Sequence, residues 1–584
     1  MACFETDEKT AMTCILSIHC GIHDSAAALL DGYRVVAAIQ KERLSRIKKE
    51  GGAPRDCVAE VLSIGGVQPS DVDVVVFSRC EFPRAFYKTD LFRRWRDTIQ
   101  GRSGTRDLST VLAKAGLLDP AQVLDIAKVL EFYGIPAGTK VFFANHHAAH
   151  ALPSLFFTDW DDALLYTADG AGDNVNYSHR VFKDGRLTTL FGDDRWLHRA
   201  YRIDSLARAY ANVTEALGFR PLHHEGKVTG LAAYGKPTIS KDFAAHFSMD
   251  ENGLFTSDFP NGGAMREAFM ALCEGQSRED ASASIQTFVE EAIVGSVSKL
   301  LEREKVSRLG LAGGLFANVK LNQRLAETCG LKEVFIVPPM GDEGLVIGGA
   351  LQFLLERDGF GVWLTRRYRL GDVYWGRAFA GVTGSRFREF SSRIHRLDGA
   401  PVPVAAHLLA EGKAVAIVSQ RMEFGPRALG ARTIMASPLR RDINDSLNTR
   451  LDRSEFMPFA PVIAEEDART VFDVTDVNAY ACRFMTITCN VKPDWRDRIP
   501  AVVHVDNTAR PQVIRRADNP LYYDILADFK AETGLPAAVN TSFNVHEEPI
   551  INTPEEAARA LVDNRIDYLV TDDGVYGVEP AVAE

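Results

Sequence analysis

Apolar runs alternate with polar loops along the chain, and two stretches near its start share one layout. CILSIHCGIHDSAAALLDGYRVVAAIQ, which begins at Cys14, predicts strand, polar loop, strand, Asp-Gly turn and strand. ALLYTADGAGDNVNYSHRVFKDGRLTTLF predicts the same order, with a strand at 164–167, a loop at 168–173 and an Asp-Gly turn at 184–185. Asp-Gly between apolar runs is a strong hairpin signal. The repeated unit predicts two related half-domains whose first hairpin loops face a common cleft.

Helical spacing and glycine loops fill the rest of the chain. ASIQTFVEEAIVGSVSKLLEREK has the apolar period of a helix. DGFGVWLTRRYRLGDVYWG has no clear period and several glycines, so we place a domain boundary near 365–375. Short strand-like and helical runs alternate after it, which predicts a separate α/β domain at 371–584 after an N-terminal domain at 13–370. Residues 1–12 are acidic and polar, and we expect a disordered leader.

Composition narrows the class of protein. A chain of 584 residues is too long for one core, so two or more domains are expected. The net charge of −11 argues against a general nucleic-acid binder. The sequence contains no run of about 18 apolar residues, so no membrane span is predicted. The N-terminus does not resemble a signal peptide. Nine cysteines without a C-x-x-C pair indicate reduced thiols in a cytoplasmic protein.

The stretch NHHAAH places two histidines four residues apart where an apolar run ends. If a helix begins at about His146, then His146 and His150 share one face and could bind one metal ion. Asp169 and Asp342 each follow a predicted strand, and ligands bind at strand ends in the cleft of an α/β fold. Taken without other residues, the histidine pair could simply be polar residues that cap the start of a helix. With the two carboxylates, a site suited to iron or zinc is favoured. His147 is expected to be structural or to support the metal ligands.

The first hairpin loop contains His19, His23 and Asp24. A histidine there could act as a general base, because its pKa lies near neutrality. Asp24 and Ser25 could instead only form the hydrogen bonds of the turn. The residues alone leave both interpretations open.

Glycines interrupt two further stretches. Gly313 and Gly314 separate a strand from a helix, where glycine lets a ligand approach the backbone and the helix N-terminus favours anions. A tight strand–helix turn would use the same residues. Lys227 and Lys236 lie in GKVTGLAAYGKP and could bind phosphate or substrate, or belong to a solvated loop.

Basic and small polar residues gather at strand-to-loop junctions of the C-terminal domain. They are Arg427, Arg432, Arg453, His504, Arg510, Asn540, Ser542 and Asn544. Several arginines with small polar donors would form an oxyanion or phosphate pocket. Scattered surface arginines, each with its own salt bridge, are the alternative.

Eight motifs together resemble the O-carbamoyltransferases of nodulation-factor and antibiotic biosynthesis. They are HHAAHA, TADGAGD, GKVTGLAAYG, LAGGLFANVKLN, FGPRALGARTIMASP, PFAP, VHVDNTARPQ and VNTSFN. The resemblance runs from about Ile15 to Val575, and FGPRALG followed by NTSFN is highly specific. It implies a duplicated N-terminal domain with the actin and sugar-kinase (ASKHA) fold, similar to the tRNA threonylcarbamoyl transferase. A YrdC-like α/β domain would follow.

The resemblance also implies a reaction. Carbamoyl phosphate would donate its carbamoyl group, through ATP and carbamoyl-adenylate, to a hydroxyl group of a small-molecule acceptor. The metal would be Fe(II) or another divalent ion, with Mg²⁺ as a further candidate. Neither nucleic acid nor membrane is an expected partner, and a homodimer is left open. The implied residues are His146, His150, Asp169 and Asp342 for the metal; Gly313, Gly314, Asn318 and Lys227 for the nucleotide; His23 as base with Asp24 beside it; and Arg427, Arg453, His504, Arg510, Asn540 and Ser542 for carbamoyl phosphate.

The sequence departs from the family pattern at two places. Met457 stands where some members have arginine, and PPMGDEG has one residue fewer before Asp342. Loops at 81–135 and 193–225 are predicted to shape the acceptor pocket.

Three rival functions would each require other sequence features. The basic stretch 88–106 could contact RNA in a tRNA threonylcarbamoyl-type enzyme, but the acidic balance argues against it. A hydrogenase-maturation carbamoyltransferase would carry an acylphosphatase module and C-x-x-C zinc fingers, which this sequence lacks. An inactive nucleotide-binding scaffold would not need these histidines, aspartates and arginines.

Overall fold

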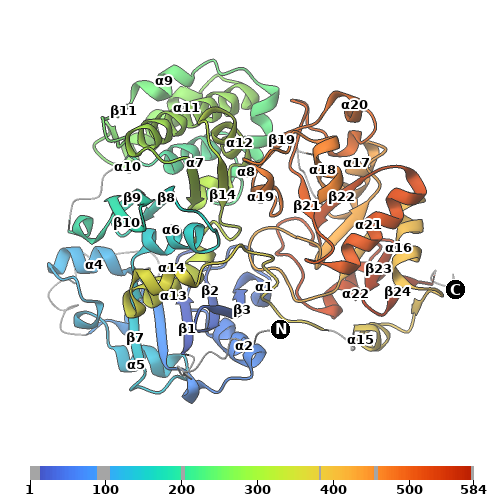
Figure 1. Cartoon of the computed structure of the whole chain (residues 1–584), viewed down its shortest axis with the longest axis horizontal. Helices are drawn as coiled ribbons and strands as arrows, with labels where there is room; N and C mark the ends of the chain where they lie inside the picture. Colours follow the sequence, from blue (N-terminus) through green and yellow to red (C-terminus); the bar gives the residue numbers. More distant parts are fainter. Residues whose placement is uncertain are drawn as a thin grey trace, which may run out of the picture.

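Two sheets with their helices form the N-terminal half, and a third sheet forms the C-terminal half beside it (Figure 1). The computed structural model describes residues 13–79, 81–88, 105–198, 204–379, 383–452 and 458–579. The predicted leader, Arg453, Met457 and most of the basic stretch 88–106 therefore lie outside the described residues.

The first sheet has the strand order β3-β2-β1-β4-β7. Its strands are β1 (Cys14–His19), β2 (Ala26–Asp31), β3 (Arg34–Gln40), β4 (Val74–Ser78) and β7 (Lys140–Ala144). β1 to β3 are antiparallel neighbours, and the turn between β2 and β3 is the predicted Asp-Gly turn. β4 and β7 run parallel to β1, so their carboxyl ends meet at one edge of the sheet.

The second sheet repeats this arrangement in the order β10-β9-β8-β13-β14. Its strands are β8 (Ala163–Gly172), β9 (Val175–Lys183), β10 (Arg186–Phe191), β13 (Arg308–Ala312) and β14 (Glu333–Ile336). The strand directions are also the same, which confirms the predicted duplication. β8 runs further than predicted, to Gly172, because Ala168 and Gly172 of the expected loop at 168–173 pair with β9 on either side of an irregularity.

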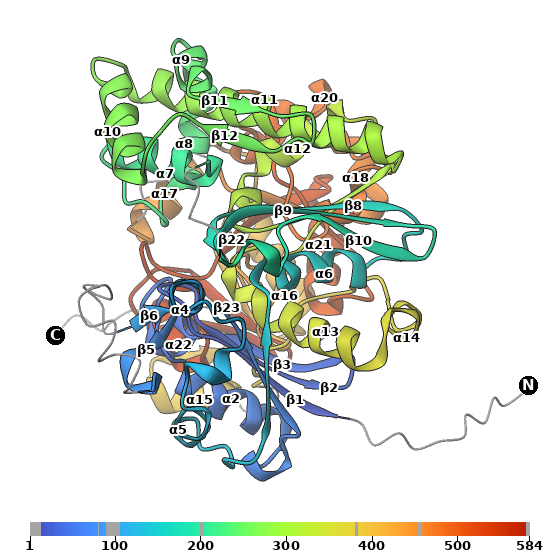
Figure 2. The same ribbon diagram turned by 90° about the vertical axis from the view of Figure 1, so that its left-hand side faces the viewer.

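Two helices, α6 (His146–Phe156) and α13 (Leu345–Asp358), lie between the two sheets (Figure 2). They cross closely, because a Cβ at Gly348 would lie 1.6 Å from the carbonyl oxygen of Ala149. Glycine is therefore required at this crossing. The other helices of this half include α2 (Arg55–Gly65), α7 (Leu206–Ala216), α8 (Glu225–Leu231), α10 (Gly262–Cys273), α11 (Arg278–Glu304) and α12 (Val319–Thr328).

The C-terminal half is built on an eight-stranded sheet in the order β15-β24-β23-β16-β17-β22-β18-β21. The strands are β15 (Ile394–Arg396), β16 (Val415–Val418), β17 (Arg432–Ala436), β18 (Ala460–Ala464), β21 (Gln512–Ile514), β22 (Ala537–Ser542), β23 (Tyr568–Thr571) and β24 (Gly574–Val578). Its helices include α16 (Pro401–Ala410), α21 (Pro520–Thr533) and α22 (Pro554–Val562). The predicted α/β character is confirmed.

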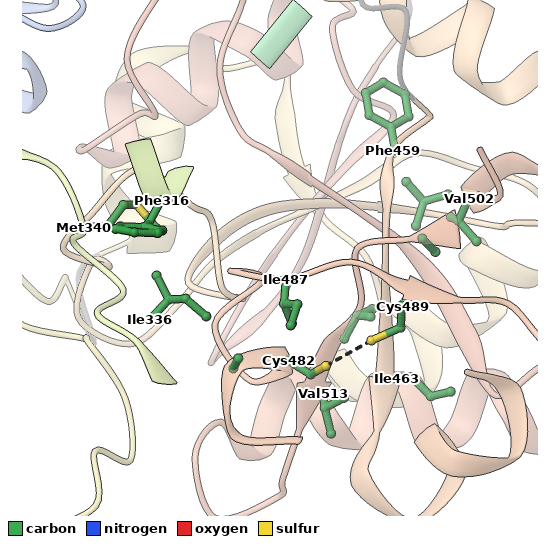
Figure 3. Close-up of a cluster of buried hydrophobic side chains, with 14 of the residues drawn as sticks. Phe316, Ile336, Met340, Phe459, Ile463, Cys482, Ile487, Cys489, Val502 and Val513 are labelled. Atoms are coloured by element: carbon green, nitrogen blue, oxygen red, sulfur yellow. Dashed lines mark hydrogen bonds between the residues drawn. The ribbon is translucent and has the colours of Figure 1, made fainter. Parts of the chain in front are cut away.

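Both halves contribute to one apolar cluster at their junction (Figure 3). Phe316, Ile336 and Met340 come from the first half, and Phe459 and Ile463 come from the second. Nearby, the rings of Phe335 and Tyr480 stack with centroids 4.5 Å apart. Across the described ranges, no helix is both long and apolar enough to cross a membrane.

Candidate functional site

The helix α6 begins at His146, as predicted, and its start is fixed by two side chains. The side chain of Asn145 accepts a hydrogen bond from the backbone N–H of Ala148 (2.8 Å), which caps the helix. The carboxylate of Asp173 accepts one from the N–H of His146 (2.7 Å). The rings of His146 and His150 consequently lie on one face, with centroids 4.7 Å apart.

Four predicted ligands meet at this face of α6. Nε2 of His150 lies 3.1 Å from Oδ2 of Asp169 and 3.3 Å from Oδ1 of Asp342. Nε2 of His146 lies 3.4 Å and 3.7 Å from the same two oxygens. One ligand atom from each residue lies within 4.8 Å of the other three. We call these four residues the metal quartet.

The electrostatics of the metal quartet favour a positive charge at its centre. Burial alone would lower the pKa of His150, but Asp169 and Asp342 raise it to about 9. Burial alone would raise the pKa of Asp169, but hydrogen bonds with His146 and His150 hold it well below its usual range. Two imidazoles and two carboxylates are a donor set that suits a divalent transition metal, so the residues fit the implied ion.

Gly172 makes room for one of these ligands. A Cβ at this position would lie 2.1 Å from Cδ2 of His146. The glycine in TADGAGD was therefore a readable signal for the close approach of β8 to α6. His147 is held apart from the metal quartet, by Oγ1 of Thr167 (2.8 Å) and the carbonyl of Val175 (3.1 Å). These contacts agree with both predicted roles, a structural residue or a support for the metal ligands.

The first hairpin loop faces the metal quartet. Nδ1 of His23 lies 3.0 Å from Oδ2 of Asp24, and Nε2 of His19 lies 3.8 Å from Oδ2 of Asp342. Burial alone would lower the pKa of His23, but the hydrogen bond to Asp24 and the charge of Asp342 raise it to about 9. The predicted base is therefore mainly an imidazolium ion at neutral pH and must lose a proton before it can accept one.

Sequence reasoning missed two charged residues beside this pair, Lys49 and Glu343. Lys49 and Asp24 both have positive φ angles, 56° and 53°, and their backbones are joined by an N–H···O contact of 3.4 Å. Nζ of Lys49 lies 4.0 Å from Oδ2 of Asp24 and donates to the carbonyl of Leu222 (2.5 Å). Burial raises the pKa of Glu343 to about 8. No periodic pattern marks such positions, although strained residues cluster at functional sites.

The Gly-Gly loop lies against the end of β8. Gly313 has a φ of 99°, and a Cβ there would lie 2.3 Å from the carbonyl oxygen of Ala168. A Cβ at Gly314 would lie 3.3 Å from Oδ1 of Asp169. The loop therefore runs directly beside the metal quartet. Asn318 caps α12 through the N–H of Leu321 (3.1 Å).

A cavity of about 260 Å³ lies between the two halves. Thr229, Gln286 and Lys320 line it from the N-terminal half, and His504 and Asp506 line it from the C-terminal half. None of the four predicted nucleotide residues lines it. Gly313 and Gly314 lie beside β8, Lys227 lies on α8, and Asn318 hydrogen-bonds Gln286.

The loop that carries Arg427 is held by a buried carboxylate. Oε1 of Glu423 accepts hydrogen bonds from the backbone N–H groups of Leu429 (2.8 Å), Ala431 (2.7 Å) and Arg432 (3.1 Å). Gly425 and Gly430 have φ angles of 121° and 117°, so the loop needs glycine at both places.

Four of the six residues expected to bind carbamoyl phosphate come from neighbouring segments. The amide of Asn540 donates to the carbonyl of Ala428 (3.2 Å), beside Arg427, and to Oε1 of Gln512 (2.7 Å), two residues after Arg510. Ser542 lies two residues further along β22. His504 lines the cavity instead, and the four described residues among the other five do not.

Arg432 corrects a sequence expectation. The sequence places it with Arg427 on a glycine-rich loop, but it begins β17 and is fully buried. Its guanidinium donates to the carbonyls of Ser419 (2.8 Å), Ala431 (2.8 Å) and Asn552 (3.4 Å). It is therefore a structural residue rather than part of an anion pocket.

One segment of the first half reaches the C-terminal loops. The guanidinium of Arg43 donates to the carbonyl of Gly425 (2.7 Å). Arg46 donates to the carbonyls of Pro549 (2.7 Å) and Ile550 (2.8 Å). This segment continues to Lys49, so it joins the first hairpin loop to the Arg427 loop.

Comparison with known proteins gives one family for both halves. The family description "Carbamoyltransferase N-terminus" matches residues 14–351, and "Carbamoyltransferase C-terminus" matches residues 406–577. Nodulation protein NolNO of Sinorhizobium fredii is 31% identical over 565 residues, covering 94% of this chain and 78% of that protein. Nodulation protein U of the same organism is 30% identical over 611 residues, covering 97% and 100%.

Solved structures give weaker likenesses. Full-length HypF in its phosphate- and nucleotide-bound form is 14% identical with a TM-score of 0.36, covering 59% of this chain and 56% of that one. The ROK hexokinase of Thermus thermophilus is 16% identical with a TM-score of 0.29, covering 58% and 98%.

Proposed function

This chain belongs to the carbamoyltransferase family, and we propose that it moves the carbamoyl group of carbamoyl phosphate, through carbamoyl-adenylate, onto a hydroxyl group of a small molecule. The observation that carries the proposal is that the first hairpin loop, which contains the His23–Asp24 pair, contacts the metal quartet through His19 and Asp342. A cytoplasmic location agrees with the seven free cysteines among the described residues.

The C-terminal half would catalyse the first step, the cleavage of carbamoyl phosphate. Arg427 and Arg510, with Arg453, would supply positive charge for a doubly charged acyl phosphate. Asn540 and Ser542 add neutral donors. Water would cleave the carbamoyl phosphate, which releases phosphate and leaves carbamate. The carbamate oxygen would then attack the α-phosphorus of ATP, and pyrophosphate would leave with its bonding electrons.

The metal quartet would hold Fe(II) or another divalent ion. A bound ion there would neutralise phosphate charge and orient the nucleotide. The Gly313–Gly314 loop lies beside Asp169, so phosphates held at the metal quartet would lie next to its backbone. Mg²⁺ could accompany the nucleotide.

The final step would use His23. Its neutral ring would take the proton of the acceptor hydroxyl while the oxygen attacks the carbamoyl carbon and AMP leaves. The Asp24 carboxylate, 3.0 Å away, would stabilise the imidazolium ion that forms. AMP is a far better leaving group than oxide, which explains why carbamate would be activated first.

A panel of hydroxylated acceptors, incubated with ATP and carbamoyl phosphate, tests the proposal. One acceptor should gain the mass of one carbamoyl group while AMP and pyrophosphate appear. Release of pyrophosphate should require carbamoyl phosphate. If no pyrophosphate is formed with any acceptor, and the protein instead binds tRNA in a salt-sensitive manner, the tRNA-modifying alternative replaces it.

A further inference from the structure

We propose that Arg79 is a positioning residue for the metal quartet, because its guanidinium fixes the start of the helix that carries His146 and His150. The inference rests on the proposed function, since it concerns how the metal ligands of that site are held. A guanidinium stays protonated and does not bind a cation, so Arg79 acts through other residues. These residues are the carboxylates of Asp173 and Asp194.

Arg79 lies where a strand of the first sheet ends against α6. It directly follows β4, and its backbone N–H donates to the carbonyl of Ala144 (3.2 Å), the last residue of β7. Arg79 is buried, with 5% of its surface exposed. A charged group away from water is costly unless it is paired and hydrogen-bonded. The partners of the guanidinium therefore determine where the side chain lies.

Two carboxylates share this guanidinium. Oδ2 of Asp173 lies 3.2 Å from Nε of Arg79 and 3.0 Å from Nη2. Nη1 donates to Oδ2 of Asp194 (3.1 Å), and Nη2 contacts Oδ1 of the same residue. Burial alone would raise the pKa of Asp194, but the hydrogen bonds and charge of Arg79 hold it below its usual value. Only the planar fork of arginine can bridge two carboxylates in this way, which a lysine cannot do.

Each carboxylate also holds one group at the start of α6. Oδ2 of Asp173, which contacts Arg79, accepts the hydrogen bond from the N–H of His146 (2.7 Å). Oδ1 of Asp194 accepts one from Nδ2 of Asn145 (2.7 Å), the residue that caps the helix. The first metal ligand and the cap before it are therefore both tied to Arg79 through one carboxylate each.

Asp173 belongs to the same hairpin as the ligand Asp169. It lies in the turn after β8, with a φ of 48°. Its Oδ1 accepts a hydrogen bond from Oγ of Ser109 (2.5 Å), in the first turn of α4 (Leu108–Ala115). A displaced Asp173 would change the position of His146 relative to Asp169. Ligands must stay within about 0.5 Å of the productive geometry, so a small displacement is enough to weaken metal binding.

Binding of Co(II) to the full-length, metal-free chain tests the proposal, because the visible absorption of this ion reports its ligand geometry. Arg79→Gln should weaken Co(II) affinity by about 10–100-fold, the usual effect of residues that support metal ligands. It should also change the spectrum of the bound ion. Arg79→Lys should recover only part of the affinity, because it keeps the charge but cannot bridge both carboxylates. Competition with a chromophoric chelator measures each affinity.

Arg483→Gln is the matched control for a purely structural role. The guanidinium of Arg483 is also buried, with 9% of its side chain exposed, and pairs with Asp518 (2.9 Å) in the C-terminal half. This variant should lose stability in urea but bind Co(II) like the wild type. If Arg79→Gln loses stability in the same way and keeps the affinity and spectrum of the wild type, the proposal is overturned.

Asp194→Ala keeps the test decisive if Arg79→Gln does not fold. The side chain of Asp194 is 55% exposed, so its removal leaves no buried group unpaired except on Arg79, which retains Asp173. We expect weaker Co(II) binding, because the cap residue Asn145 loses its partner. Unchanged Co(II) affinity in this variant would also overturn the proposal.

These measurements use neither ATP nor an acceptor, so they are independent of the proposed reaction. If the acceptor panel shows no carbamoylation while Arg79→Gln still weakens Co(II) binding, the positioning role stands and the proposed function fails. If an acceptor is carbamoylated but the wild type binds no Co(II), the role of Arg79 is overturned and the proposed function stands.

Discussion

His150 and Asp169 lie 19 residues apart in the chain, and their Nε2 and Oδ2 atoms are 3.1 Å apart. The helix that carries His150 follows the last strand of the first sheet, and Asp169 lies near the end of the first strand of the second sheet. The contact therefore ties the two repeats together at the point where we place the metal.

Removal of one ligand should weaken metal binding strongly. We expect His150→Ala to lower metal affinity by more than the roughly 10–100-fold typical of residues that only support ligands. Elemental analysis after dialysis measures this without any activity assay. His246→Ala should retain the metal content of the wild type. Equal metal content in His150→Ala and the wild type would remove the metal quartet from the proposal.

The Gly-Gly loop gives a prediction on stability. Gly313→Ala combines a positive φ with a Cβ that would lie 2.3 Å from the carbonyl of Ala168. Gly275→Ala has only the positive φ, since no atom lies within 4 Å of its Cβ. We expect a loss of about 1–2 kcal/mol for Gly275→Ala and about 4 kcal/mol or more for Gly313→Ala. Urea denaturation measures both, and equal losses would contradict the close contact.

His23 should control the transfer step. His23→Asn should slow carbamoylation of the acceptor by about 10²–10⁴-fold, as expected for loss of a general base. Formation of carbamoyl-adenylate should continue. Separate assays of pyrophosphate release and acceptor carbamoylation measure the two steps. If both fall together, His23 has a structural role at the turn, and Asp24 becomes the next candidate for the base.

The protonation of His23 should also appear in the stability of the metal-free protein. Its pKa in the folded chain is about 9, above the ordinary value of 6.5. The added stability is therefore complete below about pH 6.5 and disappears as the pH rises towards 9. The difference in unfolding free energy between the wild type and His23→Asn should shrink over this range. A constant difference would mean that Asp24 does not hold the proton on His23.

Arg510 should separate the two half-reactions. Loss of a buried charge-assisted contact costs about 2–5 kcal/mol. Arg510→Ala should therefore abolish phosphate release from carbamoyl phosphate while ATP binding is retained. Arg440→Ala, at an exposed arginine paired with Asp442, should change neither. Loss of ATP binding in Arg510→Ala would indicate one shared site or global unfolding.

The sequence predicted the features that depend on neighbouring residues, namely turns, helix faces and strand ends. The two Asp-Gly turns gave both hairpins, and the helix period placed His146 and His150 on one face. The strand-end rule added Asp169 and Asp342, so the metal quartet could be assembled from the sequence. The error at Arg432 has a physical cause: an arginine at the first position of a buried strand can be satisfied by backbone carbonyls.

Contacts between distant segments could not be predicted. Nothing in the pattern around Arg43 or Arg46 indicates the carbonyls near positions 425 and 549 that they contact. The same holds for His504, which lies close in sequence to Arg510 but lines a cavity with Gln286 and Lys320. Such contacts depend on how two separately predictable halves pack together.

The shared apolar cluster at the junction has a consequence for dividing the gene. A chain that stops near residue 370 would leave Phe335 without the ring of Tyr480 and would expose the apolar face that contains Phe316 and Met340. Large exposed apolar patches promote aggregation. Expressed alone, each half should accumulate as insoluble material. Coexpression of the two fragments should recover a complex, because the buried surface that each fragment lacks is supplied by the other.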